Sequence, residues 1–285
     1  MATDTSVSLR SGINCNNKVA EVASVAVDLK TKDNHHRDVR WLFLRTLHTK
    51  LDAIAAADQN QMGHTGDFPE QTRKLFDILD TLVPSGGGTV CEIGFNVGHS
   101  AATFLIATSA KSFIAFDCGN KASVNAGFSS LQESLPYAHF EMIEGNSPVM
   151  VNKFAQQRGL DAVCDVIHID GAHDGPFPAA DWEAMWHYAR DDGRTLIVFD
   201  DCNCDTEWCI APLQVFQAAV SRGEILQLPD GASMLQVDGR PDSPDYREKG
   251  SCVGWVTSKR KEKIEVPTFL IDQRDGIRLE INEKC

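Results

Sequence analysis

Acidic residues directly follow two apolar segments of this sequence. In "VIHIDGAHD" an apolar run ends at Asp170, and His173 comes three positions later. In "TLIVFDDCN" a second apolar run leads into Asp200 and Asp201. Because the carboxyl ends of parallel strands lie at one edge of a sheet, these side chains are expected to share a single site.

The three carboxylates form an all-oxygen ligand set. Such a set suits Mg²⁺ better than a thiophilic ion. Mg²⁺ usually keeps positions open for water or substrate, so a substrate hydroxyl bound there becomes more acidic. His173, with an ordinary pKa of about 6.5, is placed to accept that proton. We therefore interpret Asp170, Asp200 and Asp201 as metal ligands and His173 as a general base; a loop histidine bonded to a carbonyl is the alternative.

A second motif, "VCEIGFNVGHSAATFL", combines a predicted strand with a glycine turn. Gly94 and Gly98 bracket the turn, and Ser100 opens a helix whose first amide groups have no partner within the helix. Asp117 ends the next predicted strand, where an acid accepts hydrogen bonds from ribose hydroxyls. The pattern predicts a nucleoside ligand. A glycine turn that serves packing is the alternative, and the Gly-x-x-x-Gly spacing weighs against a dinucleotide site.

Composition limits the class of protein. The chain has 285 residues, 42% of them hydrophobic and 24% charged, so it can bury a large core. Its formal charge of -13 disfavours binding to nucleic acid or to an anionic membrane. We find no secretory signal pattern and no long apolar run, and therefore expect a cytoplasmic protein. Nine cysteines, mostly in apolar segments, are expected to be free thiols.

Apolar spacing predicts amphipathic helices over 37–57 and 69–83. The predicted strands are Thr89–Ile93, Ser112–Phe116, His139–Ile143, Val163–Ile169, Thr195–Phe199, Glu224–Gln227 and Cys252–Val256. Helix-length segments separate most of them, which argues for a doubly wound α/β sheet of seven mostly parallel strands, preceded by an N-terminal helical segment.

A family resemblance covers roughly residues 68–203. The segment "EQTRKLFDILDTLVPSGGGTVCEIGFNVGHSA", followed by "FIAFD", "EGNS", "IHIDGAHD" and "IVFDDCN", resembles the class I S-adenosylmethionine-dependent O-methyltransferases. Within that class it is similar to the metal-dependent branch, which includes catechol and caffeoyl-CoA methyltransferases and the macrocin-type sugar methyltransferases. The resemblance implies a Rossmann-like fold and methyl transfer from S-adenosylmethionine.

The resemblance also implies a cofactor site. The matching positions are Glu92, Gly94, Gly98, Ser100, Asp117, Asn146, Ser147 and Asp170. The first four line the methionine end of the cofactor in the family, Asp117 matches the acid that holds the ribose, and Asn146 and Ser147 stand where the family contacts the adenine edge.

The metal site of the family matches Asp170, Asp200 and Asp201. Catechol-type enzymes commonly carry Asn at the third position, whereas sugar-directed members carry an acid there, as this sequence does with Asp201. His173 stands where the catechol-type enzymes have a lysine base and the sugar-directed ones a histidine. The acid at Asp201, where catechol-type enzymes have Asn, favours a non-aromatic hydroxyl substrate.

We therefore predict Mg²⁺-assisted methyl transfer to a hydroxyl of a small molecule, with no nucleic-acid or membrane partner. The alternatives are a nucleoside-binding module without turnover and an NAD-dependent oxidoreductase. The expected organisation is an N-terminal arm and helical cap at 1–65, the methyltransferase domain at 66–262 and a C-terminal extension at 263–285. The N-terminal segment is expected to form part of the pocket or to contact another subunit of a homodimer or higher homo-oligomer.

Three further features carry no site prediction. His168 and the pair Trp182 and Trp186 are expected to be packed in the core. A zinc or redox site in "DCNCDTEWC" is disfavoured because no Cys-x-x-Cys spacing or histidine pair accompanies its cysteines, and a loop over the active site is the preferred interpretation.

Overall fold

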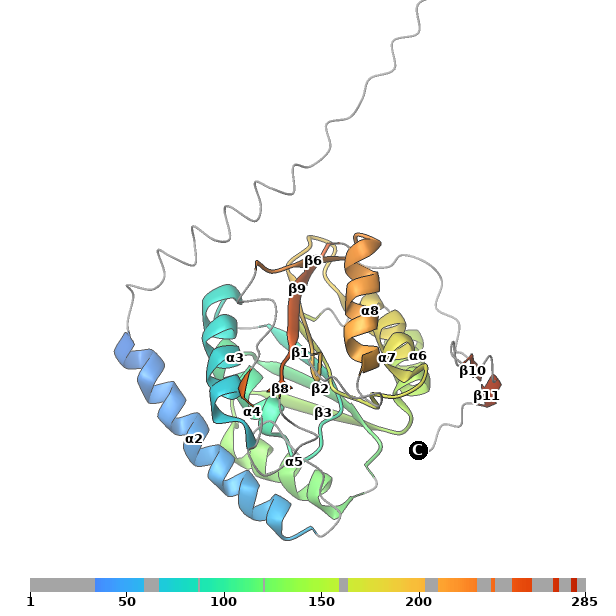
Figure 1. The fold of residues 1–285 in the computed structure, drawn as a ribbon. Coiled ribbons are helices and arrows are strands. Elements are labelled where there is room, and N and C mark those ends of the chain that lie inside the picture. The colour runs from blue at the N-terminus through green and yellow to red at the C-terminus, as the bar shows by residue number, and fades with distance from the viewer. Residues whose placement is uncertain are drawn as a thin grey trace, which may run out of the picture.

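The computed structural model describes residues 34–58, 67–86, 88–119, 121–158, 164–202, 210–229, 237–238, 248–257, 269–271 and 278–280 (Figure 1). Its helices are α2 (Asn34–Ala56), α3 (Pro69–Leu82), α4 (His99–Thr108), α5 (Ala122–Ser134), α6 (Ser147–Arg158), α7 (Phe177–Met185), the 3-10 helix η3 (Trp186–Tyr188) and α8 (Ile210–Ser221). Its strands are β1 (Thr89–Ile93), β2 (Ser112–Asp117), β3 (His139–Glu144), β4 (Val166–Ile169), β5 (Thr195–Phe199), β6 (Ile225–Gln227), β7 (Val237–Asp238), β8 (Glu248–Lys249), β9 (Cys252–Val256), β10 (Phe269–Ile271) and β11 (Arg278–Glu280).

Seven strands form one sheet in the order β3-β2-β1-β4-β5-β9-β6. Strands β1 to β5 pair in parallel, whereas β9 runs antiparallel to both β5 and β6. The predicted doubly wound, mostly parallel sheet of seven strands is confirmed. The strand order reverses between β1 and β4, and such a switch point is where open α/β sheets bind their ligands.

Strand boundaries follow the apolar runs closely. The predictions for β1, β5 and β9 agree with the structure residue for residue. The prediction for Val163–Ile169 was too long, since β4 begins at Val166 and Val163 lies outside the described residues. The backbone amide of Cys164 donates instead to the carbonyl of Tyr188, at 2.8 Å.

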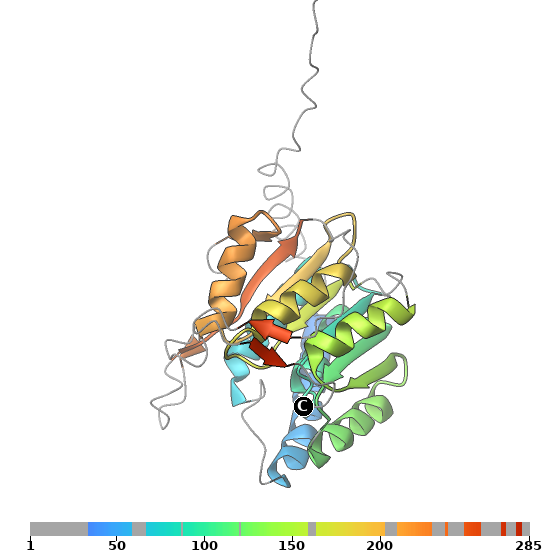
Figure 2. The same ribbon diagram turned by 90° about the vertical axis from the view of Figure 1, so that its right-hand side faces the viewer.

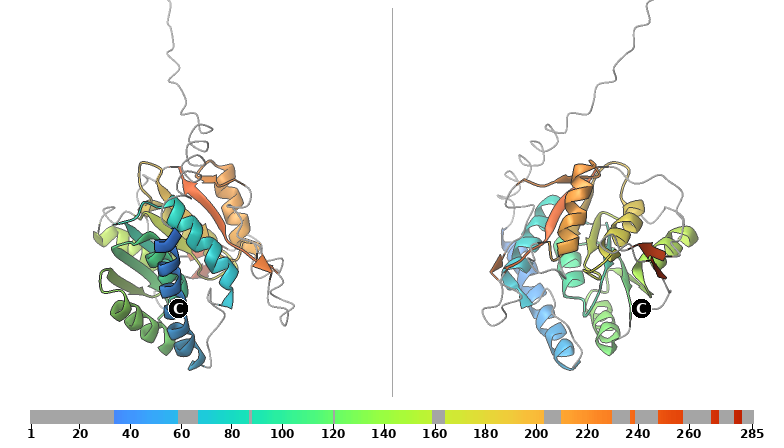
Figure 3. Two further views of the ribbon diagram at one scale, coloured as in Figure 1. Left: turned by 90° about the vertical axis from the view of Figure 1, so that its left-hand side faces the viewer. Right: turned by 45° about the vertical axis from the view of Figure 1, so that its right-hand side comes forward.

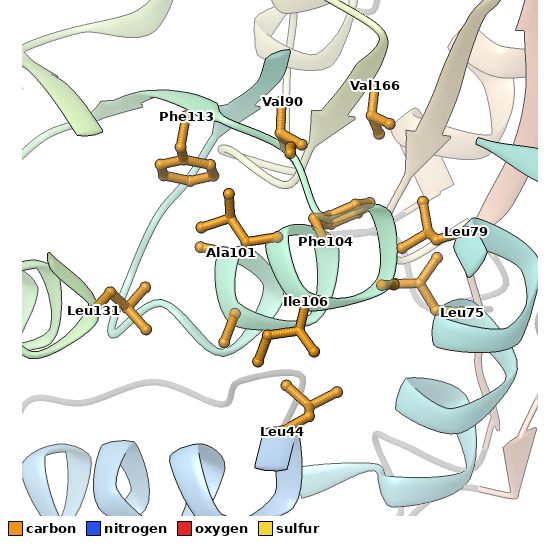
Figure 4. Close-up of a cluster of buried hydrophobic side chains, with 14 of the residues drawn as sticks. Leu44, Leu75, Leu79, Val90, Ala101, Phe104, Ile106, Phe113, Leu131 and Val166 are labelled. Carbon is orange, nitrogen blue, oxygen red and sulfur yellow. The ribbon is translucent and has the colours of Figure 1, made fainter. Parts of the chain in front are cut away.

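Helices cover both faces of the sheet. Alternate residues of β1, β4 and β5, such as Val90 and Val166, pack against α2, α3, α4 and α5 (Figure 4). The intervening residues, such as Ile93 and Phe199, pack against α6, α7 and α8. Trp182 and Trp186 belong to this second cluster and stack with ring centroids 5.6 Å apart, as their predicted core packing requires.

Helix α4 lies between the sheet and an outer layer of α2 and α3 (Figure 3, left). All ten of its residues are buried, including the polar residues His99, Ser100, Thr103 and Thr108. Arg40 of α2 donates to the carbonyls of Ile106 and Ala107 at the end of α4 and pairs with Asp80 of α3. Although α2 is the longest helix, neither it nor any other described helix is long and apolar enough to cross a membrane.

The C-terminal strands do not join the central sheet. β10 and β11 pair with each other in an antiparallel two-stranded sheet (Figure 2), and β7 and β8 form another. The predicted domain boundaries near residues 65 and 262 lie outside the described residues and remain predictions.

The expectation of free thiols was wrong for three cysteines. Cys91 on β1 forms a disulfide with Cys164, with Cα atoms 5.9 Å apart, and Cys118 is also disulfide-bonded. Cys202 and Cys252 are free and buried. Because Cys91 and Cys164 are 73 positions apart, only the pairing of β1 with β4 brings their side chains together.

The outer helices allow a matched test of the core. Leu79 of α3 is fully buried and Leu42 of α2 is 65% exposed. Leu79→Ala should lower the free energy of unfolding by about 3 kcal/mol, because it leaves a cavity beneath α4. Leu42→Ala should change it by less than about 0.5 kcal/mol. Urea unfolding of both variants checks this, and equal effects would contradict the described packing of α3.

Candidate active site

All the predicted site residues lie at the carboxyl edge of the sheet. The ends of β1, β2 and β3 and the turns and helix starts that follow them carry the predicted cofactor residues other than Asp170, and the loops after β4 and β5 carry the acids and His173. Since β1 and β4 are neighbours, the two halves of the site meet at the switch point of the sheet (Figure 1).

Gly94 is the point of contact between the two halves. Its φ of +86° favours glycine, and a Cβ atom there would lie 1.9 Å from the backbone carbonyl oxygen of Asp170. The amide of Gly94 donates to Phe116 of β2, and the amide of Asp170 donates to Ile93 of β1, both at 2.9 Å. The turn therefore lies directly against Asp170, the first of the predicted metal ligands.

The turn ends at Gly98, which is the N-cap residue of α4 and has a φ of +96°. As a glycine it offers no side chain to the first amide groups of α4. Ser100 lies in this first turn and is buried. The start of α4 thus has the backbone arrangement that attracts an anionic group such as a carboxylate.

Asp117 holds two loops together. Its Oδ2 accepts a hydrogen bond from the amide of Asn96 at 3.0 Å, and its Oδ1 accepts one from the amide of Gly119 at 2.9 Å. The carboxylate is partly exposed. Each carboxylate oxygen has a further acceptor position, so this arrangement is compatible with hydrogen bonds from two ribose hydroxyls.

The loop after β3 leads to an acid that sequence reasoning left without a role. The hydroxyl of Ser147 donates to Oδ1 of Asp181 at 2.7 Å, and the carbonyl of the preceding Asn146 accepts from Met150 in the first turn of α6. Asp181 is fully buried, and its Oδ2 has no hydrogen-bond partner among the described residues. A Cβ atom on Gly171 would lie 2.8 Å from that oxygen, so Asp181 lies beneath the loop that carries Asp170.

Burial raises the pKa of Asp181 to about 7, although Ser147 and His173 act in the opposite direction. The sequence around Asp181 gives no local signal of its burial beneath the site. Asp181 stands among helix residues, and its contacts come from two other segments of the chain.

The three predicted metal ligands lie around His173. Nε2 of His173 is 3.2 Å from Oδ1 of Asp170, and its Nδ1 is 3.1 Å from Oδ2 of Asp201. Asp201 has a φ of +52°, a left-handed conformation that Asp tolerates better than most residues. Asp201 comes two residues after the end of β5, and in this conformation its carboxylate contacts His173.

His173 carries a proton at neutral pH in this arrangement. Burial alone would lower its pKa, but the hydrogen bond to Asp170 and the charges of Asp170, Asp201 and Asp200 raise it to about 9. A histidine in this state is a proton donor. His173 can therefore act as the predicted base only if another positively charged group binds the carboxylates of Asp170 and Asp201.

Glu92 and His168 form a fully buried pair. Oε1 of Glu92 lies 2.8 Å from Nδ1 of His168, and the two residues are register partners on β1 and β4. Burial raises the pKa of Glu92, and the hydrogen bond and charge of Glu92 raise the pKa of His168 against the effect of burial. The predicted core position of His168 is confirmed, but it lies against site residues.

Gln71 and Ser251 are site residues that sequence reasoning missed. The Nε2 group of Gln71 donates to Oδ1 of Asp200 at 3.0 Å, and the hydroxyl of Ser251 donates to the same oxygen at 2.7 Å. Gln71 stands on the stripe of α3 that continues with Leu75 and Leu79. A polar residue such as Gln71 on an apolar helix stripe can be recognised in the sequence as a candidate buried hydrogen-bond donor. Ser251 lies in no pattern that would single it out.

Two groups of side chains have the ligand spacing of a metal site. One consists of His168, Asp170 and Asp200, and the other of Asp170, His173 and Asp201; within each, the ligand atoms lie within 4.8 Å of one another. Asp170 belongs to both groups. Of the nearby cysteine-rich segment, only Cys202 is described; Cys204, Trp208 and Cys209 lie outside the described residues.

Comparison with known proteins identifies similar folds. Residues 91–202 match a family model described as a methyltransferase domain. The structure is similar to that of an O-methyltransferase from Bacillus cereus in complex with SAH, with a TM-score of 0.55 and 14% identity over 74% of this chain and 90% of that chain. It is also similar to cofactor-bound Rv0187 from MTB, with a TM-score of 0.52 and 12% identity over 83% and 97% of the two chains. No curated protein matches the sequence significantly.

The sheet topology and the similar structures show the Rossmann-like fold of class I methyltransferases, and the match to the methyltransferase domain model is limited to residues 91–202. The predicted fold class is confirmed. The acceptor and the roles of the site residues remain predictions.

The raised pKa of Asp181 predicts a pH-dependent stability difference. The folded value of about 7 exceeds the ordinary value of 3.8, so between these values the folded state holds a proton that the unfolded chain releases. The free energy of unfolding therefore falls across this window as the pH rises. Asp181→Asn removes the effect, so its stability relative to wild type should increase by about 2 to 3 kcal/mol from about pH 5 to about pH 8.

Urea unfolding at the two pH values measures this difference. Asp174→Asn, a change of an exposed acid near the same loop, serves as the control and should show no such trend. A constant difference between Asp181→Asn and wild type would contradict the raised pKa.

Proposed function

We propose that this chain transfers a methyl group from S-adenosylmethionine to a hydroxyl of a small molecule, with the help of a divalent metal ion. The contact between Gly94 and the carbonyl of Asp170 is the observation that carries the proposal, because it sets the cofactor turn against the acids. The similar Bacillus cereus O-methyltransferase was determined with SAH, the product form of that cofactor.

The cofactor half of the site fits S-adenosylmethionine. When bound, this cofactor supplies a methyl group on a positively charged sulfur. The start of α4, which has no side-chain cap hydrogen bond, suits its carboxylate, and Asp117 suits its ribose hydroxyls. Asn146 and Ser147 would contact the adenine edge, and the bond from Ser147 to Asp181 holds that loop in position.

The acidic half fits a divalent cation. Asp170 is shared by both groups of closely spaced ligands, of which one also contains Asp200 and the other Asp201. Three carboxylates face the single positive charge of His173 in a largely buried region, so a divalent cation would balance the remaining negative charge. When bound, Mg²⁺ or a similar ion acts as a Lewis acid that makes an acceptor hydroxyl easier to deprotonate.

His173 would take the proton from the acceptor hydroxyl. It can do so only in its neutral form, which requires that Asp170 and Asp201 be engaged by a cation in place of the imidazolium. His173 therefore serves as the counter-charge of the acids when the site is empty and as the base when substrate is bound.

Cofactor binding is the first test. S-adenosylmethionine or S-adenosylhomocysteine should raise the melting temperature of the protein, while NAD should not. Asp117→Asn should weaken S-adenosylhomocysteine binding by about tenfold, because a charged acceptor is lost. Protection by NAD would favour an oxidoreductase instead, and protection by neither compound would remove the methyltransferase proposal.

Turnover is the second test. With a panel of small hydroxyl compounds and mass spectrometric detection of methylated product, Asp170→Asn and His173→Ala should lower kcat by about 100-fold or more. Asp174→Asn, the same chemical change four positions from Asp170, should keep wild-type turnover. A chelator should abolish activity, and Mg²⁺ or Mn²⁺ should restore it. Full activity of His173→Ala at saturating substrate would exclude the base.

A further inference from the structure

We propose that His168 is an additional ligand of the metal ion, giving the site one nitrogen donor beside its carboxylates. The inference rests on the proposed function, which places a divalent cation at Asp170 and Asp200. It goes beyond that function because it assigns a ligand from inside strand β4 and predicts which metal ions the site prefers.

The position of His168 supports ligation. The strand alternation places His168 and Asp170 on the same face of β4, and His168 is the register partner of Val198, two residues before Asp200 on β5. Ligand atoms of His168, Asp170 and Asp200 lie within 4.8 Å of one another, which is close enough for one ion to draw them together.

Glu92 leaves His168 only one nitrogen for a ligand. Nδ1 of His168 faces Oε1 of Glu92 at 2.8 Å, so Nε2 is the ring atom that can bind a metal. The Phe104 ring, with its centroid 4.7 Å from that of His168, packs against the imidazole and limits its rotation. Metal-bound histidines characteristically donate their other N–H to a carboxylate in this way, which fixes the ring and increases its basicity.

Asp200 is held in a comparable manner. Gln71 and Ser251 both donate to its Oδ1, which fixes the orientation of the carboxylate. Oε1 of the same Gln71 amide is buried and has no hydrogen-bond partner among the described residues. A bound ion that retains a water molecule would bring a donor into this polar region.

His173 is the competing imidazole, and its contacts differ. Its ring nitrogens face Asp170 and Asp201, which are themselves proposed metal ligands, whereas the carboxylate partner of His168 is Glu92, which is not one. Ligation by His168 leaves His173 available for proton transfer.

A nitrogen donor changes the metal preference. Mg²⁺ favours all-oxygen sites, whereas imidazole binds Mn²⁺ and the later first-row ions more readily. Wild-type protein should therefore bind Mn²⁺ more tightly than Mg²⁺.

The experiment is pulsed electron paramagnetic resonance of full-length protein loaded with Mn²⁺ alone, with calorimetry for affinity. Wild-type protein should show electron spin-echo modulation from ¹⁴N. His168→Gln should lose this modulation and bind Mn²⁺ at least about tenfold more weakly, because a ligand is lost. His173→Gln, the matched control, should keep the modulation. Glu92→Gln should weaken Mn²⁺ binding by about 10- to 100-fold while His168 remains.

Three results would overturn the proposal: Mn²⁺ binding without ¹⁴N modulation in wild type, modulation that persists in His168→Gln, or modulation that disappears in His173→Gln. In each of these the metal is still bound, so the proposed function stands. Absence of Mn²⁺ binding would also overturn it, together with the proposed metal, and S-adenosylhomocysteine binding would then decide whether the cofactor site survives.

Folding of the variants is checked by thermal unfolding. Should His168→Gln not fold, His173→Gln prepared with ¹⁵N-labelled histidine decides the question. Replacement of the ¹⁴N modulation by a ¹⁵N signal in that protein assigns the ligand to a histidine other than His173, and His168 is the other described histidine grouped with these acids. An unchanged ¹⁴N signal would exclude histidine ligation.

Discussion

The close approach of β1 and β4 is the constraint on which the site depends. These strands are register partners up to Ile93 and Ile169, and the chain can turn away from β1 only through a residue without a Cβ atom. Gly94 meets that requirement and lies against the carbonyl of Asp170. A binding turn and an acidic loop, about 75 residues apart in the chain, therefore share one backbone contact.

Burial of charge imposes the second constraint. Glu92, Asp200 and Asp201 are almost inaccessible to solvent, and a buried carboxylate is stable only with hydrogen bonds or a counter-charge. The structure supplies these from separate elements: His168 to Glu92, and Gln71 to Asp200. The polar side chains beneath α3 and α4 thus compensate the acids and also orient them.

The N-terminal helices take part in this arrangement. Asp52 of α2 pairs with Nε2 of His99 at 2.9 Å, at the start of α4, and Arg40 binds the carbonyls at the end of the same helix. Helix α3 contributes Gln71 directly to Asp200. Both ends of the helix that would face the cofactor are therefore fixed by α2, which gives the N-terminal segment a structural role in the site.

The sequence by itself determined the local features: apolar runs specify the strands, acids follow directly after Ile169 and Phe199 at the predicted site, and the spacing of Gly94 and Gly98 marks the turn. These could be predicted because they depend on near neighbours in the chain. The tertiary structure alone decided the partners, including Glu92 with His168, 76 positions away, the role of Asp181 beneath two loops, and the disulfide of Cys91. Such contacts follow from strand order and register, since residues adjacent in the sheet come from segments whose pairing no local pattern encodes.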